Sequence, residues 1–196
     1  MKKLLFTFLL SFGLLSMKAE QTVGEFSNSY FGQDFEIEAS QKNDKLEEVY
    51  IGVNARDSKT AFIGVKGKEL EEFKNSLIQL RDKYLEWVKV AKDNNVTEMN
   101  KEFGIKFPSV TIAWHGSKWW FSFGKKPNFK FIILDSGKMV ASWVPKVVSS
   151  SNQYIDETIY FVFADEDDFN NLIDQLDYNT ILGKLLKTKN NENLFQ

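Results

Sequence analysis

A long amphipathic segment between Leu70 and Ala91 constrains the fold of this chain more than any other feature. Its apolar residues fall at positions 70, 73, 77, 80, 84, 87 and 91, and these spacings of three and four place them along one side of a helix. Such a helix is roughly 35 Å long at 1.5 Å per residue. Three heptads also suit a coiled coil, but aromatic residues on the stripe, among them Phe73 and Trp87, favour packing against a sheet. We therefore expect this helix to cover one face of a β-sheet.

Strand patterns lie on both sides of this helix in the sequence. Alternating apolar and polar residues predict strands at 34–40, 46–55 and 60–66, then hairpins over 110–123 and 128–144 and a strand at 154–163. A shorter helix is expected at 165–176, with Asp165 as its N-cap, followed by a helical turn at 180–187. This order predicts an α+β fold with an antiparallel sheet of about eight strands, in two strands-then-helix halves, packed by one long and one shorter helix.

The two predicted helices resemble each other in sequence. EEFKNSLIQL at 71–80 aligns without gaps with DDFNNLIDQL at 167–176, and the alignment matches Phe73 to Phe169. This similarity fits either an ancient duplication or two amphipathic helices of similar composition.

The N-terminus has the layout of a secretory signal peptide. Lys2 and Lys3 precede an apolar run at 4–15, and the small residues Ser16 and Ala19 follow it. The run is too short to span a membrane, and a buried N-terminal helix is the alternative interpretation. We expect cleavage after Ala19 and export to the periplasm or the cell exterior. The predicted organisation is a signal peptide at 1–19, a lead-in at 20–33, one α+β domain at 34–188 and a frayed tail at 189–196.

Charge and cysteine content exclude several classes of function. Removal of residues 1–19 takes away three lysines and no acidic residue, so the 22 basic and 27 acidic residues that remain give a net charge of −5. Nucleic-acid binding needs clustered positive charge, so we expect no nucleic-acid partner. The chain has no cysteine, which excludes disulfides, a lipoprotein anchor, cysteine nucleophiles and cysteine-ligated zinc. After removal of the signal peptide no apolar run of spanning length remains, so we expect a soluble protein.

The sequence assigns no catalytic residue, metal site or cofactor. His115 is the only histidine, and no G-x-S-x-G motif accompanies it. The acidic run at 165–168 lacks the glycine and glutamate that a calcium-binding EF-hand loop needs, and helix capping explains it instead. The segment GVKGKE at 64–69 has neither of the glycine patterns that bind phosphates. A hydrolase that uses carboxylates far apart in the sequence remains an alternative.

The segment TIAWHGSKWWFSFG at 111–124 holds three of the five tryptophans. A two-residue turn at Gly116–Ser117 would pair Trp114 with Trp119 on an apolar, core-facing side, and would leave Trp120 on the other side. Trp120 is then either a binding platform or covered by another part of the fold. The candidate ligand-binding residues are Trp120, Lys118, His115, Lys125 and Lys126.

The expected function is non-catalytic binding of a ligand or an envelope protein by an exported bacterial protein. Glycan binding through Trp120 is the first alternative to this interpretation. The order of the elements resembles that of the Whirly family of single-stranded-DNA-binding proteins. This resemblance is one of topology, covers most of the chain after residue 19 and carries over no residues. Export and net negative charge both weigh against DNA as the ligand.

Overall fold

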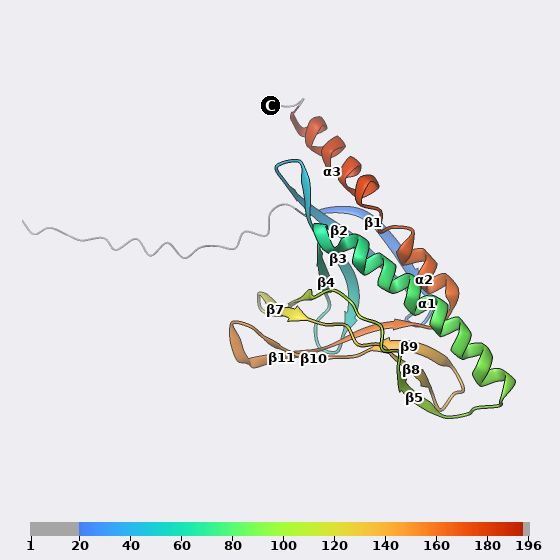
Figure 1. Ribbon diagram of the computed structural model, residues 1–196. Coiled ribbons are helices and arrows are strands. Elements are labelled where there is room, and N and C mark those ends of the chain that lie inside the picture. Colours follow the sequence, from blue (N-terminus) through green and yellow to red (C-terminus); the bar gives the residue numbers. More distant parts are fainter. Residues whose placement is uncertain (1–19, 194–196) are drawn as a thin grey trace, which may run out of the picture.

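The computed structural model describes residues 20–193, so the predicted signal peptide lies outside the described residues. Within this range the chain forms an antiparallel sheet of 11 strands and three α-helices, which confirms the α+β class (Figure 1). The sheet is larger than the eight strands expected. None of the helices in this range is long and apolar enough to cross a membrane.

The elements follow one another in two runs of strands, each ending in helix. The first run is β1 (Gln21–Asn28), β2 (Gln33–Lys42), β3 (Lys45–Ala55), β4 (Ala61–Lys66), the 3₁₀ turn η1 (Gly67–Glu69) and α1 (Leu70–Asp93). The second is β5 (Met99–Glu102), β6 (Val110–His115), β7 (Trp119–Lys125), β8 (Lys130–Ile133), β9 (Met139–Trp143), β10 (Lys146–Ser149), β11 (Asn152–Phe163), α2 (Glu166–Ile173) and α3 (Tyr178–Asn193).

The main path of the sheet runs β5-β8-β9-β11-β3-β4-β6-β7, with β1 and β2 beside β3 and with β10 beside β11. Strand β3 changes partner along its length, because β2 pairs with its first part and β11 pairs with its end. The last strand of the path, β7, also meets the β10–β11 hairpin. There the Ser122 hydroxyl donates to the Val148 carbonyl at 2.7 Å, and the Ser150 amide donates to the Phe121 carbonyl at 2.8 Å. These bonds protect the outer edge of β7.

Helix α1 packs against the sheet, as its apolar stripe predicts. Leu70, Phe73, Leu77, Leu80, Tyr84 and Ala91 are all buried, whereas Trp87 is half-buried. All three helices of the described chain lie on one side of the sheet, and α1 runs diagonally across it (Figure 1). The opposite side of β2, β3, β4 and β6 is therefore left without a helix.

Buried polar groups fasten the helices to the sheet. The Tyr84 hydroxyl lies 3.0 Å from the Met139 carbonyl and 2.7 Å from the Ala164 carbonyl. The Asp168 carboxylate is 1 % exposed and accepts hydrogen bonds from the amides of Ser29 (2.6 Å) and Ala164 (2.8 Å). Helix capping accounts for the acidic run as expected, because the Asp165 side chain accepts a 2.9 Å bond from the Asp168 amide.

Three strands and one helix end differ from the sequence-based expectation. Residues 20–33 are not a lead-in, because β1 pairs with β2 and buries Val23 and Phe26; a register shift next to Gly24 interrupts its alternating pattern. Strand β5 has the sequence MNKE and shows almost no apolar signal, and β10 is only four residues long. The tail expected to fray from residue 189 continues α3 as far as Asn193.

Candidate functional site

The tryptophan hairpin has a register different from the one predicted. His115 pairs with Trp119 and Trp114 pairs with Trp120, so the loop contains three residues, 116–118, rather than two. A shift of one residue exchanges the two faces of a strand. Trp120 therefore lies on the side of the buried Trp114 and packs against the core, whereas Trp119 lies on the outer side beside His115.

The five residues predicted as a ligand site do not form one group. The Lys118 ammonium lies 4.5 Å from the centre of the half-buried Trp120 ring, so these two residues are together. His115 is exposed on the other face, and its ring lies 5.1 Å from that of Trp119. Lys125 ends β7 opposite Val110, and Lys126 is exposed in the loop that follows.

Rows of paired residues cross the helix-free side of the sheet. Residues directly opposite in an antiparallel ladder point to the same side. One row is Glu38–Tyr50–Gly64–Thr111, the next is Gly52–Phe62–Ala113–Phe121, and the pair His115–Trp119 continues the same side. The helix-covered side of these strands instead carries Val49, Ile51, Ile63 and Ile112 in the core.

Aromatic rings form a continuous row on this outer side. The Tyr50 and Phe62 ring centres are 6.4 Å apart at an interplanar angle of 78°, and those of Phe62 and Trp119 are 6.0 Å apart. His115 meets Trp119 edge-on at 5.1 Å. Phe62 is buried between its neighbours, whereas Tyr50 and Trp119 are half-buried and reach the solvent. We call Tyr50, Phe62, Trp119 and His115 the aromatic row.

Three glutamates, Glu20, Glu38 and Glu48, lie at the Tyr50 end of the aromatic row, and we call them the carboxyl cluster. The Tyr50 hydroxyl donates to Glu48 Oε2 at 3.0 Å. The other oxygen, Glu48 Oε1, is buried, and Thr111 also hydrogen-bonds to the Glu48 carboxyl. Glu48 Oε1 lies over Gly64, where an added Cβ would be only 2.5 Å away. Gly64 therefore leaves the space that the Glu48 carboxyl occupies.

Burial makes these carboxyls weaker acids than usual. Burial and then repulsion by Glu38 raise the pKa of Glu20 to about 7. Burial also raises the pKa values of Glu38 and Glu48, although hydrogen bonds from Glu20 and Tyr50 respectively oppose the effect. The pKa of Tyr50 is raised by burial and by its acidic neighbours, so its hydroxyl stays protonated. Near neutral pH the cluster therefore offers both donors and acceptors of hydrogen bonds.

The cluster does not have the geometry of a glycoside hydrolase pair. The Glu20 and Glu38 carboxyls are hydrogen-bonded to each other, whereas catalytic carboxyls lie about 5 to 9.5 Å apart on either side of the scissile bond. Among residues 20–193, no group of three or more histidine, aspartate or glutamate side chains is arranged to hold a metal ion. This arrangement suits hydrogen bonding to a ligand.

Sequence reasoning missed the carboxyl cluster and assigned the outer tryptophan to the wrong position. The alternation at 34–40 predicts a strand but does not distinguish its glutamates from ordinary solvent-exposed residues. A usable signal was the pattern of Glu48 and Tyr50 on one strand followed by Gly64 on the next, since a glycine can leave room for a neighbouring side chain. No protein-family model, curated protein or solved structure matches the chain.

Proposed function

We propose that this protein is a non-catalytic binding domain exported to the bacterial envelope, and that its helix-free sheet face binds a glycan. The observation that carries the proposal is the contact between the aromatic row and the carboxyl cluster on one uncovered face. The N-terminal sequence supports export, because positive, apolar and small residues follow one another in the order of a signal peptide.

The chemistry of the face matches that of a sugar. One side of a pyranose ring presents C–H groups that stack on an aromatic ring, and its hydroxyls need donors and acceptors at the edge. Trp119 offers a half-buried ring for stacking, and Tyr50 with the carboxyl cluster, at the other end of the aromatic row, offers polar atoms for the hydroxyls. The carboxyl cluster repels anions, so a neutral glycan fits this face better than a phosphorylated or acidic one.

Two neighbouring tryptophans provide a matched test. The chain 20–196 would be screened against an array of neutral and acidic glycans, and hits would be measured by calorimetry with the Trp119→Ala and Trp120→Ala variants. We expect Trp119→Ala to weaken binding at least tenfold, which corresponds to about 1.4 kcal/mol. Trp120→Ala should instead lower the unfolding temperature and leave the affinity of the folded protein unchanged. Full affinity in Trp119→Ala, or no binding to any glycan by the folded chain, would refute the proposal.

A second candidate function, docking of an envelope protein, is favoured by an apolar patch next to this face. Phe123 is 59 % exposed and Val148 is 41 % exposed. The Phe121 and Phe123 rings stack with centres 6.0 Å apart and continue the outer side of β7. A photo-reactive residue at position 123 should give one discrete crosslinked partner in cells, whereas the same residue at the exposed Glu86 of α1 should not. Identical products from both positions would count against specific docking.

A further inference from the structure

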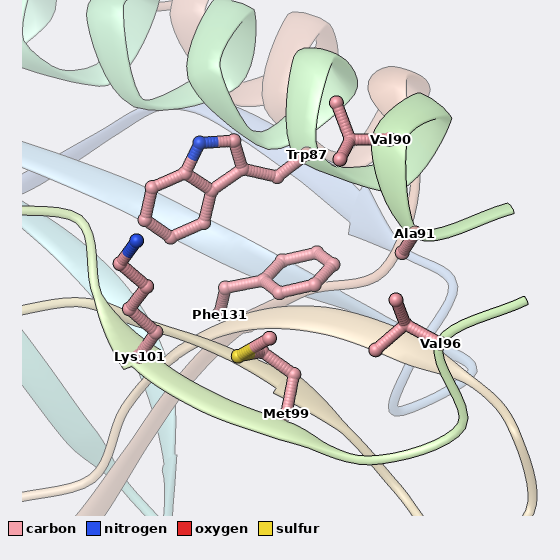
Figure 2. Close-up of a pocket in the computed structure, with 7 residues that line it drawn as sticks. All are labelled: Trp87, Val90, Ala91, Val96, Met99, Lys101 and Phe131. Atoms are coloured by element: carbon pink, nitrogen blue, oxygen red, sulfur yellow. The ribbon is translucent and has the colours of Figure 1, made fainter. Parts of the chain in front are cut away.

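A small apolar slot lies at the C-terminal end of α1, and its volume is about 130 Å³. It is formed by α1, the loop after α1, the edge strand β5 and strand β8 (Figure 2). The side chains that line it are Trp87, Val90, Ala91, Val96, Met99, Lys101 and Phe131. Lys101 is the only one of the seven that carries a charge.

Aromatic contacts fix one wall of the slot. The Trp87 ring stacks on Phe103 with centres 4.9 Å apart and an interplanar angle of 16°. It meets Phe131 edge-on, with ring centres 5.8 Å apart and an angle of 87°. Figure 2 shows Trp87 and Phe131 facing the slot from opposite elements, with Met99 and Val96 beside Phe131. Because Trp87 is held by two rings, the wall is preorganised for a ligand.

Positive charge is concentrated at the Trp87 wall. The Lys101 ammonium lies 4.9 Å from the centre of the Trp87 ring, and the Lys83 ammonium lies 5.2 Å from it. Lys83 also donates to the Phe103 carbonyl at 2.8 Å. Within residues 20–193 Lys101 makes no ion pair, and no acidic side chain lines the slot. The Lys101 ammonium is therefore available to a negatively charged group.

We propose that this slot binds a small carboxylate whose apolar part is about the size of a benzene ring. An apolar cavity of about 150 Å³ in another protein stays dry and binds benzene, so a space of this size suits one ring or one branched side chain. The apolar part lies between Trp87, Met99 and Phe131, and the carboxylate contacts Lys101. A negative ligand is favoured over a neutral or positive one because the single charge of the lining is an ammonium.

This site is separate from the proposed glycan face. The slot lies on the helix-covered side of the sheet, whereas the aromatic row lies on the helix-free side. Trp87 belongs to the slot and Trp119 to the aromatic row, so the two proposals can fail independently.

Three probes of matched shape test the proposal: phenylacetate, phenylacetamide and phenethylamine carry a negative, a neutral and a positive head on the same ring. Binding to the chain 20–196 would be followed by NMR through the indole N–H signal of Trp87, which is identified with Trp87→Phe. We expect saturable shifts in the millimolar range, with phenylacetate binding about fivefold more tightly than phenylacetamide and phenethylamine the weakest.

Two lysine variants make the test specific. Lys101→Glu should reverse the order of the three affinities, because it replaces the ammonium at the slot by a carboxylate. Lys89→Glu changes the net charge by the same amount on an exposed part of α1 that does not line the slot, and it should leave the order unchanged. Ala91→Leu should fill the slot and abolish binding of all three probes while the far-ultraviolet spectrum is preserved. Absence of saturable shifts, or equal effects of Lys101→Glu and Lys89→Glu, would overturn the proposal.

Discussion

Replacement of Glu20 by glutamine is expected to stabilise the protein above pH 7 and to have no effect near pH 4. In the folded protein, burial and the neighbouring Glu38 raise the pKa of Glu20 from 4.5 to about 7. Between these two values the folded state holds a proton that the unfolded chain has released. The wild-type protein therefore loses stability as the pH rises through this window, and the loss is complete above the folded-state pKa. Glutamine cannot ionise, so Glu20→Gln avoids the loss.

The size of the effect follows from the pKa difference. A difference of one unit between the pKa values of the folded and unfolded states corresponds to about 1.4 kcal/mol of free energy of unfolding. The Glu20 side chain is only partly buried, and solvent screening reduces the energetic consequence. We expect Glu20→Gln to raise the free energy of unfolding by about 1 to 2 kcal/mol at pH 8, relative to the wild type.

Urea unfolding between pH 4 and pH 8, followed by tryptophan fluorescence, measures this difference. The chain is expressed from Met17, so that a peptide bond and not a free ammonium precedes Glu20. Glu25→Gln, at an exposed position of the strand β1 that follows Glu20, serves as the control and should show no pH-dependent gain. A Glu20→Gln effect that is equal at pH 4 and pH 8, or a loss of stability at pH 8, would refute the assignment of a buried, protonated carboxyl.

Three further predictions concern groups whose positions the structure defines closely. Tyr84→Phe removes a buried hydroxyl that lies within hydrogen-bonding distance of two backbone carbonyls, and should lower the free energy of unfolding by about 1 to 3 kcal/mol in urea titrations. Asp168→Ala removes a buried carboxylate and leaves the amides of Ser29 and Ala164 without their acceptor, so the free energy of unfolding should fall by about 2 to 4 kcal/mol in the same assay; a fall below about 1 kcal/mol would contradict these hydrogen bonds. Gly64→Ala should displace the Glu48 carboxyl and return its pKa toward the ordinary value, as measured by carbon-13 NMR; an unchanged titration would show that this carboxyl does not lie over Gly64.

The elements with strong periodicity could be predicted from the sequence. Helix α1 matches the apolar stripe at 70–91, and strands β2, β3 and β4 match the alternating segments at 34–66 closely. Strand β5 could not be found in the same way, because it forms by backbone pairing with β8 and its side chains are mostly exposed. Local pattern reveals an element only when the element has one apolar and one polar face.

The site depended on information that local pattern does not contain. A two-residue turn and a three-residue loop are both compatible with the sequence at 115–119, and the choice between them decides whether Trp119 or Trp120 faces the outer side. The carboxyl cluster unites residues from β2, β3 and the chain just before β1, and only the pairing of these strands brings them together. Both features are properties of strand register, which a single sequence specifies weakly.

The composition of the helix-free face fits the proposed binding role better than a purely structural one. A sheet face that is merely exposed to water carries polar side chains of ordinary length, whereas this face alternates the large Tyr50 and Phe62 with the small Gly52, Gly64 and Ala113. Gly64 leaves room for the Glu48 carboxyl to lie over the sheet. In the carboxyl cluster, burial raises the pKa values and so destabilises the fold above the ordinary pKa of glutamate. Perturbed titratable groups that cost stability concentrate at sites where a ligand uses them. If the glycan is that ligand, its binding to the chain expressed from Met17 should strengthen as the pH falls from 8 to 6 and the cluster gains a proton, and this dependence should disappear in Glu20→Gln.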